Sequence, residues 1–184
     1  VVIGYDARES SPGFADSLAE VMSGNGFDVI LPERDCPTPV AAYNIVDRGA
    51  SGALMLTASH NPPEYNGVKF IPSDGAPALP EVTEQIEANL REPDLLPAAE
   101  HGTVSREDLV TVHADHAREL VDADLSGVTV VYDAIHGSGR GVTDALLESA
   151  GAEVIRHRCE DDPTFGGAHP EPSPENLREL ESLV

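Results

Sequence analysis

The 184-residue sequence predicts an α/β fold, a three-layer α/β/α arrangement around a mixed, mostly parallel sheet, followed by the start of a second similar domain. Short apolar runs alternate with helical patterns along the chain, as they do where crossover helices join parallel strands. The run at 52–57 is apolar on both faces, which is typical of a strand covered on both sides. The pattern restarts near Asp124, so we expect domains at 1–124 and 125–184.

The first domain opens with an apolar strand and a helix whose ends are marked. Ser10-Ser11-Pro12 supplies a hydroxyl cap and an early proline, and Gly24 and Gly26 provide left-handed stops. Thr38-Pro39 opens a second helix in a similar way. The elements expected in this domain are strand 1–5, helix 11–22, strand 27–31, helix 38–49, strand 52–57, strand 68–71, helix 81–91 and helix 108–121.

The second domain repeats the alternation and then stops. Its expected elements are strand 128–132, turn 137–141, helix 142–150, strand 152–155, a proline-rich loop at 163–174 and a helix starting at 174. The turn Gly137-Ser-Gly-Arg-Gly lies between a strand and a helix, which is a natural anion site. Its glycine spacing fits neither a nucleotide P-loop nor a dinucleotide fingerprint, so a tight packing turn is favoured.

The charge balance is strongly acidic, with 33 Asp and Glu residues against 11 Lys and Arg and a net charge of -22. Nucleic-acid binding requires a basic footprint and is disfavoured. The acidic residues are dispersed over helical segments, which indicates a solvated acidic surface of the kind found in halophilic proteins. At about 1 M salt the Debye length is about 3 Å, so repulsion among such carboxylates is tolerable. A specific basic partner is the alternative.

No secretory signal and no apolar stretch of membrane-spanning length is visible in the sequence, so we expect no membrane association and a cytoplasmic location. Cys36 and Cys159 lie far apart and are expected to be ordinary thiols. The chain begins Val-Val-Ile-Gly, without an initiator Met and directly in a core strand. We therefore expect a piece of a longer protein.

The polar loop that follows the strand at 52–57 carries the best candidates for chemistry. Ligands of open α/β sheets bind at the carboxyl ends of strands, which is where this loop starts. Phosphoryl transfer needs an oxygen, cations and a group that moves a proton. Ser59 offers the oxygen, His60 a donor or proton shuttle, and Lys69, the only lysine in the chain, a compact positive charge. Asn61 lies in the same loop.

Other candidate side chains lie outside this loop. Arg8 follows the first strand and could approach a phosphate on Ser59, with a surface salt bridge as the alternative. His113 and His116 lie three apart on a helix, where a solvated face is favoured over a metal site. The remaining acidic and histidine side chains noted are assigned to solvent or given no role: Asp161, Asp162, Glu171, His136 and His169.

The segment Thr57-Ala-Ser-His-Asn-Pro-Pro-Glu-Tyr-Asn-Gly-Val-Lys-Phe resembles the active-serine signature of the α-D-phosphohexomutases. That family includes phosphomannomutase, phosphoglucomutase and phosphoglucosamine mutase. Further segments resemble the family in the same order along the chain, at 1–11, 35–40, 130–139 and 170–177. The resemblance therefore covers essentially the whole chain.

The resemblance implies an isomerase that interconverts hexose 6-phosphate and hexose 1-phosphate. Ser59 would be a phosphoserine that yields a bound hexose 1,6-bisphosphate, and His60 and Lys69 match the family's basic active-site positions. Arg8 and Asn61 are the candidates for phosphate binding. Mg²⁺ would bridge the phosphate on Ser59 and a set of aspartates that this chain lacks.

The departures from the family limit what the chain should do. The Asp-Gly-Asp-x-Asp-Arg metal loop, the loops of the third and fourth domains and the N-terminal Gly-x-Arg-Gly segment are missing, so the fragment alone is expected to be inactive. The segment 63–66 looks more like the mannose/glucose branch. Phosphoglucosamine mutase and a non-catalytic sugar-phosphate-binding fragment stay as alternatives. A serine hydrolase or phosphatase ranks low, because no glycines flank Ser59 in the Gly-x-Ser-x-Gly pattern.

Overall fold

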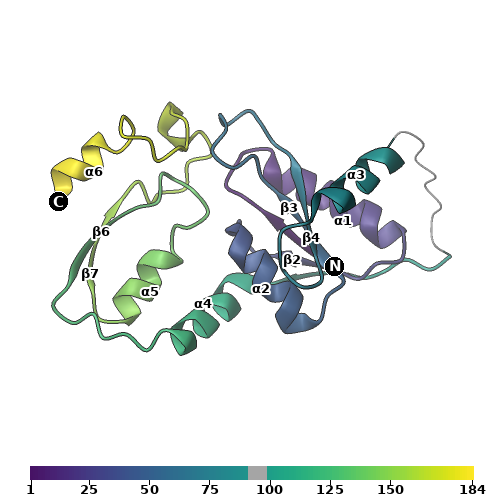
Figure 1. Ribbon diagram of the computed structural model, residues 1–184, viewed down its shortest axis with the longest axis horizontal. Helices are drawn as coiled ribbons and strands as arrows, with labels where there is room; N and C mark the ends of the chain where they lie inside the picture. Colours follow the sequence, from purple (N-terminus) through teal and green to yellow (C-terminus); the bar gives the residue numbers. More distant parts are fainter. Residues whose placement is uncertain (91–98) are drawn as a thin grey trace.

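A computed structural model describes residues 1–90 and 99–184 and contains two sheets (Figure 1). The larger sheet has five strands in the order β4-β3-β1-β2-β5, and the smaller pairs β6 with β7. The strands of the larger sheet are β1 (Val2–Tyr5), β2 (Val29–Pro32), β3 (Gly52–Leu56), β4 (Val68–Pro72) and β5 (Val104–Glu107). All pair in parallel except β4, which runs antiparallel to β3. The predicted mixed, mostly parallel α/β fold is confirmed.

Two helices cover the larger sheet from opposite faces. α1 (Ser11–Gly24) packs on one face over a cluster that includes Ile3, Leu31 and Leu56. α2 (Thr38–Arg48) packs on the other face over a cluster that includes Val2 and Met55. The alternation of side chains along β1 and β3 thus feeds two separate cores, as expected for a strand pattern that is apolar on both faces.

Gly4 lets α2 lie close to the centre of the sheet. A Cβ at this position would lie 2.7 Å from the sulfur of Met55 and 3.1 Å from the Cβ of Ala41. No real side chain tolerates such a contact with a packed core without displacement of its neighbours. The glycine in β1 is therefore a packing requirement.

β5 is a strand that the sequence pattern missed. It lies at the edge of the sheet, where Val29–Pro32 of β2 pair with Val104–Glu107. Only one of its four side chains is apolar, and Val104 is 49% exposed. An edge strand with little burial has no apolar run to mark it.

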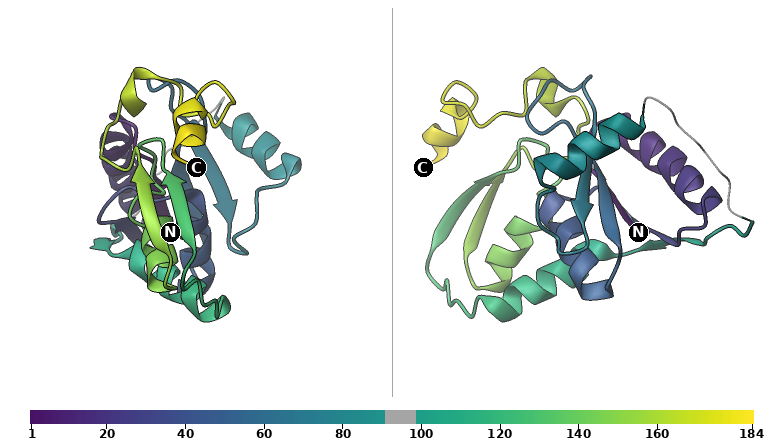
Figure 2. Two further views of the ribbon diagram at one scale, coloured as in Figure 1. Left: turned by 90° about the vertical axis from the view of Figure 1, so that its left-hand side faces the viewer. Right: turned by 45° about the vertical axis from the view of Figure 1, so that its right-hand side comes forward.

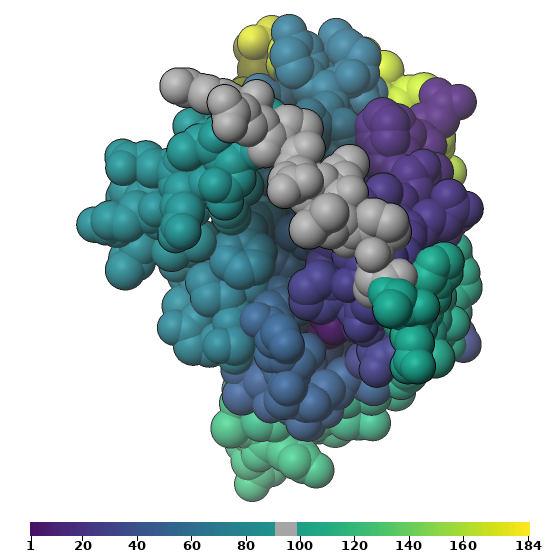
Figure 3. All heavy atoms as spheres, turned by 90° about the vertical axis from the view of Figure 1, so that its right-hand side faces the viewer, coloured from purple at the N-terminus to yellow at the C-terminus, as the bar shows by residue number. Residues whose placement is uncertain are grey.

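The helices after β4 differ in how much they bury. α3 (Pro80–Asn89) has no buried residue and projects as a teal lobe in Figure 3. The expected end of this helix at Arg91 lies outside the described residues. α4 (Leu109–Leu120) is capped by Asp108, whose carboxylate accepts from the amide of Thr111, and it packs on α2 through Leu109 and Val110.

The second unit contains the two-stranded parallel sheet and short helices, seen from its own side in the left view of Figure 2. It also holds a one-turn 3-10 helix, η1. Its elements are β6 (Thr129–Asp133), α5 (Thr143–Ser149), β7 (Glu153–His157), η1 (Phe165–Gly167) and α6 (Arg178–Leu183). The expected elements are present with small changes in their bounds, and α6 begins at Arg178 rather than at Pro174. None of the described helices is long and apolar enough to span a bilayer.

Candidate active site

Ser59 lies three residues beyond β3, on the loop that joins β3 to β4. Its side chain is exposed, so the hydroxyl is not packed in either core. Its amide donates to Oγ1 of Thr57 at 3.0 Å, and its φ of 58° is in the left-handed region. Few residues other than glycine adopt this conformation, and such backbones occur often at functional sites. The fold therefore presents this hydroxyl to solvent on a constrained turn.

His60 contacts the serine directly. Oγ of Ser59 lies 3.3 Å from Nδ1 of His60, within hydrogen-bond reach. An imidazole at this distance could accept the hydroxyl proton or donate to an oxygen bound to it. The structure thus brings together two of the three residues predicted as catalytic.

Arg8 lies beneath the loop rather than beside the hydroxyl. Its side chain is 0% exposed and pairs with Asp6, 3.1 Å from Nε to Oδ2. Its Nη2 donates to the carbonyls of Ser59 at 3.0 Å and Asn61 at 2.8 Å, and its Nη1 donates to the carbonyl of Pro62. The salt bridge that the alternative expected is present, but it is not at the surface, because the Arg8 side chain is fully buried. In this conformation the guanidinium donates to the loop backbone, and these hydrogen bonds hold the loop.

The other two predicted residues are less closely tied to the hydroxyl. Asn61 contributes its backbone, since its carbonyl accepts from Arg8 and its amide donates to the carbonyl of Ala58 at 3.1 Å. Its side chain is exposed. Lys69 is an exposed residue of β4 that pairs with Met55 in the ladder. Among the described residues, no hydrogen bond links Lys69 to Ser59 or His60.

The far end of the loop is anchored by residues that the sequence pattern does not mark as part of the site. Nδ2 of Asn66 donates to Oγ of Ser10 at 3.0 Å and of Ser11 at 2.8 Å, and Oγ of Ser11 donates to Asp6 at 2.7 Å. Ser10 makes no side-chain cap of α1, so that prediction is wrong: its hydroxyl is engaged by the loop instead. The sequence signal for this anchor was the Ser10-Ser11 pair after a strand, but the same pair also fits a helix cap.

Ser59 opens onto a cleft of about 330 Å³ between the two units. In Figure 1 the two units lie side by side where the β3–β4 loop of the first meets the segment of the second that contains η1. The first unit contributes Asp6, Ala7, Thr57 and Ser59, and the second contributes Asp133, Ala134, Ile135, Gly137, Ser138, Phe165, Pro170 and Pro172. The site is therefore built from both predicted domains.

Strained backbone gathers around this cleft. Ile135 has a φ of 48° and Phe165 a φ of 54°, and both line the cleft with Ser59. A β-branched or bulky residue in this region is a marked outlier. Asp133, in the same wall, is held by Arg158 and by the amide of Ile135 at 3.0 Å. Burial alone would raise the pKa of Asp133, but these hydrogen bonds outweigh it and lower the pKa, so the carboxylate stays ionised.

The described residues contain no cluster of metal-ligating side chains. No group of three or more His, Cys, Asp or Glu side chains within residues 1–90 and 99–184 could hold a metal ion. The two carboxylates of the cleft, Asp6 and Asp133, are already paired with Arg8 and Arg158. Mg²⁺ is usually held by carboxylates together with phosphate oxygens, so any such site requires ligands beyond these.

The turn at 137–141 is a packing element, as the sequence analysis favoured. A Cβ on Gly139 would lie 2.8 Å from the hydroxyl of Tyr132. The turn also presents Arg140, whose Nη1 and Nη2 bind the carboxylate of Asp35 at 2.7 and 3.0 Å. Nη2 also donates to Asp161 at 2.7 Å. Asp161 was expected to be a solvated charge, and its side chain is exposed, but its carboxylate is paired with Arg140. The turn thereby joins the second unit to the first.

The expectation of a solvated face for His113 and His116 is wrong. Both rings pack against Tyr43 of α2, His116 stacked at 4.5 Å between centroids and His113 edge-on at 5.7 Å. Nδ1 of His113 is buried without a hydrogen-bond partner among the described residues. These histidines belong to the α2–α4 packing, and they are not part of the candidate site.

This packing should make stability depend on pH. Burial lowers the pKa of His113 from its ordinary value of 6.5, and the neighbouring His116 adds to this. Below about pH 6.5 the unfolded chain binds a proton that the folded chain resists, so the free energy of unfolding should fall as the pH falls. Urea midpoints measured between about pH 7.5 and about pH 5.5 should fall more steeply for the native chain than for H113Q. The exposed His169 gives the control, because H169Q should keep the native slope.

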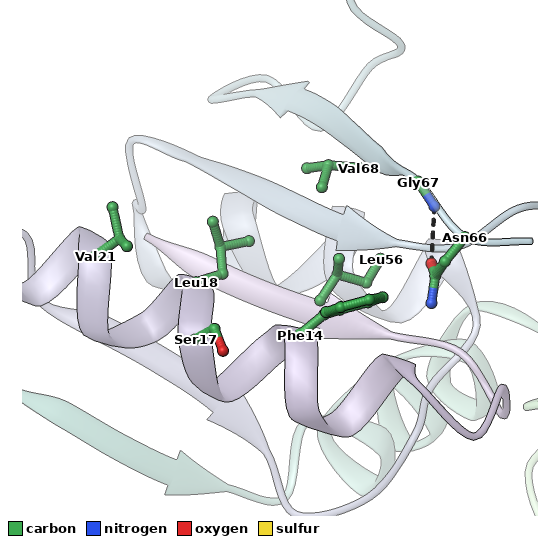
Figure 4. A pocket seen from close by; sticks show the side chains of 8 residues that line it. All are labelled: Phe14, Ser17, Leu18, Val21, Leu56, Asn66, Gly67 and Val68. Carbon is green, nitrogen blue, oxygen red and sulfur yellow. Dashed lines mark hydrogen bonds between the residues drawn. The ribbon is translucent and has the colours of Figure 1, made fainter. Parts of the chain in front are cut away.

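A second hollow, of about 370 Å³, lies between α1 and β4 (Figure 4). It is lined mainly by apolar side chains: Phe14, Ser17, Leu18, Val21, Leu56, Asn66, Gly67 and Val68. Asn66 turns back so that its Oδ1 accepts from the amide of Gly67 at 2.8 Å. This hollow has no titratable side chain in its lining, so the cleft at Ser59 is the candidate site for chemistry.

Two family models match the chain in succession. The model for phosphoglucomutase/phosphomannomutase, alpha/beta/alpha domain I, matches residues 1–96. The model for domain II of the same family matches residues 111–184. Both halves of the cleft, the Ser59 loop and the segment that includes Phe165, lie within matched residues.

Individual relatives agree with these models. A "Probable phosphoglucosamine mutase" of Methanopyrus kandleri is 34% identical over 189 residues, which is 100% of this chain and 41% of the relative. A "Probable phosphomannomutase" of Haemophilus influenzae is 32% identical over 198 residues, 100% of this chain and 40% of the relative. A solved structure from Thermus thermophilus, titled a "putative phosphomannomutase", is 32% identical with a TM-score of 0.87, and the match covers 99% of this chain and 42% of that structure's chain. The chain thus spans about two fifths of the length of these relatives.

Proposed function

Because the chain belongs to the phosphoglucomutase/phosphomannomutase family, we propose that it forms the phosphoserine-bearing part of a phosphohexomutase, with Ser59 as the residue that carries the phosphoryl group. The protein as a whole would interconvert hexose 6-phosphate and hexose 1-phosphate through a hexose 1,6-bisphosphate. Residues 1–124 would be the phosphoserine domain and 125–184 part of the next.

The observation that supports this most directly is the exposed side chain of Ser59, which lines a cleft and whose hydroxyl lies 3.3 Å from Nδ1 of His60. In the proposed half-reaction, the Ser59 oxygen attacks a phosphorus of the bisphosphate. The new bond is the serine O–P bond, and the P–O bond to the sugar breaks. His60 accepts the hydroxyl proton and returns it to the sugar oxygen, which leaves with the electron pair of the broken bond, so the product is a hexose monophosphate. Lys69, Arg8 and Asn61 are proposed as further phosphate contacts, which for Arg8 would require a change of hydrogen-bond partners.

The identity of the sugar is also part of the proposal. The segment 63–66 favours the mannose/glucose branch, whereas the Methanopyrus kandleri relative bears the name of a phosphoglucosamine mutase. We therefore propose glucose and mannose phosphates as substrates and phosphoglucosamine mutase as the second candidate. Bisphosphates of glucose and glucosamine, offered in competition for Ser59, would rank the two by the rate of labelling.

The test is phosphate transfer onto Ser59. The chain, incubated with a hexose 1,6-bisphosphate with and without Mg²⁺, should gain one phosphoryl group, measured by intact-protein mass and located by peptide fragmentation. S59A should gain none. The matched control is S51A, which removes another exposed serine hydroxyl close to β3 and should be labelled as the native chain is.

Labelling of S59A to the native level would contradict the proposal, as would a native chain that takes no phosphate or forms an acyl adduct at Ser59. Net conversion of hexose phosphates requires both half-reactions in succession, and it is not expected from this chain alone, which spans about two fifths of the length of its relatives. The Mg²⁺ requirement itself stays a prediction.

A further inference from the structure

The Arg8 side chain that holds the Ser59 loop is covered by a residue of the second unit. The ring of Phe165 lies over the guanidinium, with 5.5 Å from the Cζ of Arg8 to the ring centroid. Phe165 is 5% exposed and Arg8 is 1% exposed, so the contact excludes solvent. A cation that faces an aromatic ring in a desolvated setting gains more from the contact than one at the surface.

The backbone at Phe165 shows that this ring is held in place at a cost. Phe165, Gly166 and Gly167 follow one another with φ values of 54°, 69° and 74°. The two glycines adopt this conformation freely, but Phe165 does not. Asp162 supports the turn, because its carboxylate accepts from the amides of Thr164 at 2.8 Å and Gly166 at 3.0 Å. Strain of this kind persists where the surroundings compensate it, and here the compensation is the buried ring.

The contact links two hydrogen-bond systems. The Arg8 guanidinium donates to the carboxylate of Asp6 through Nε. Through Nη1 and Nη2 it donates to three loop carbonyls, those of Ser59, Asn61 and Pro62. Water that reached these groups would compete for each bond, whereas a ring over the guanidinium face excludes it. The loop should therefore be most rigid when the second unit is docked.

We propose that Phe165 is a positioning residue for Ser59: by covering Arg8 it lets the second unit fix the loop that presents the phosphorylatable hydroxyl. The proposal rests on the proposed function, which gives the position of this hydroxyl its importance. Phe165 also lines the cleft, but in this proposal it acts on the loop through Arg8 and not on the reacting atoms.

The test compares hydrogen exchange in variants of the unphosphorylated chain. The amides of Ser59, Asn61 and Tyr65 are hydrogen-bonded within the loop and report its opening. F165L keeps an apolar side chain but removes the aromatic face, and should speed their exchange about threefold to thirtyfold. F165Y keeps the face and should stay close to the native rates. F27L, which alters a 45% exposed phenylalanine far from the loop, is the matched control.

Native exchange rates in F165L, or equal acceleration in F165L and F165Y, would overturn the proposal. If F165L does not fold, the Nε proton of Arg8 in the native chain decides: an upfield ring-current shift supports the contact, and its absence refutes it. The exchange and chemical-shift measurements need no phosphate. Failure of Ser59 to be labelled would therefore contradict the proposed function, while the results on the Phe165–Arg8 contact would still hold. Normal labelling of Ser59 together with native amide exchange rates in F165L would support the proposed function and overturn the role of Phe165.

Discussion

Replacing Arg8 with methionine should destabilise the chain by about 3–5 kcal/mol, which is the range observed when one partner of a buried ion pair is removed. The variant would leave the carboxylate of Asp6 without its guanidinium and the carbonyls of Ser59, Asn61 and Pro62 without their donor. Each of these groups loses a hydrogen bond to a side chain that is itself fully buried. Equilibrium urea unfolding, followed by circular dichroism, measures the loss as a lower midpoint at an unchanged slope.

Arg106 provides the matched control for this experiment. It also pairs with an aspartate, Asp16, but the side chains are 48% and 57% exposed. An exposed pair contributes about 0–1 kcal/mol, so R106M should change stability little. Equal losses in R8M and R106M would show that Arg8 does not support the loop. Faster exchange at the amides of Ser59 and Asn61 in R8M alone would locate the effect there.

Contacts between neighbours in the sequence can be predicted for the candidate site, whereas contacts between distant residues cannot. The contact between Ser59 and His60 was predictable, because residues adjacent in the sequence stay close in any fold. The role of Arg8 was not, since it depends on carbonyls that lie 51 to 54 residues away and that converge only when the loop is folded. Phe165 lies still further along the chain, in a loop whose sequence suggests only turns.

The same distinction applies to the fold. Strands β1 and β3 were predictable because their side chains are buried on both faces, and the apolar run records this. β5 was missed because an edge strand needs few apolar side chains. His113 was misassigned because the ring that covers it, Tyr43, belongs to another helix. Local periodicity therefore predicts the elements, whereas the contacts between them depend on how those elements meet.

Replacing Arg140 with methionine should both destabilise the chain, by about 3 kcal/mol, and loosen the joint between the two units. Arg140 and Asp35 are 105 residues apart, and their side chains are 10% and 11% exposed. Without the guanidinium, the Asp35 carboxylate is left nearly buried with Arg34 only at 3.9 Å. Urea unfolding measures the stability, and a pair of spin labels, one on each unit, measures the spread of inter-unit distances.

R156M is the control that separates these two effects. Arg156 also binds two carboxylates, those of Asp144 and Glu148, but all three residues lie within the second unit. Its loss should lower stability while the distances between the units keep their native distribution. R140M should broaden that distribution, and adding D35N should recover part of the stability, because the uncompensated charge is removed. If R140M leaves the distances as narrow as R156M does, other contacts hold the units together. The cleft at Ser59 has one wall in each unit, so its shape depends on which outcome is found.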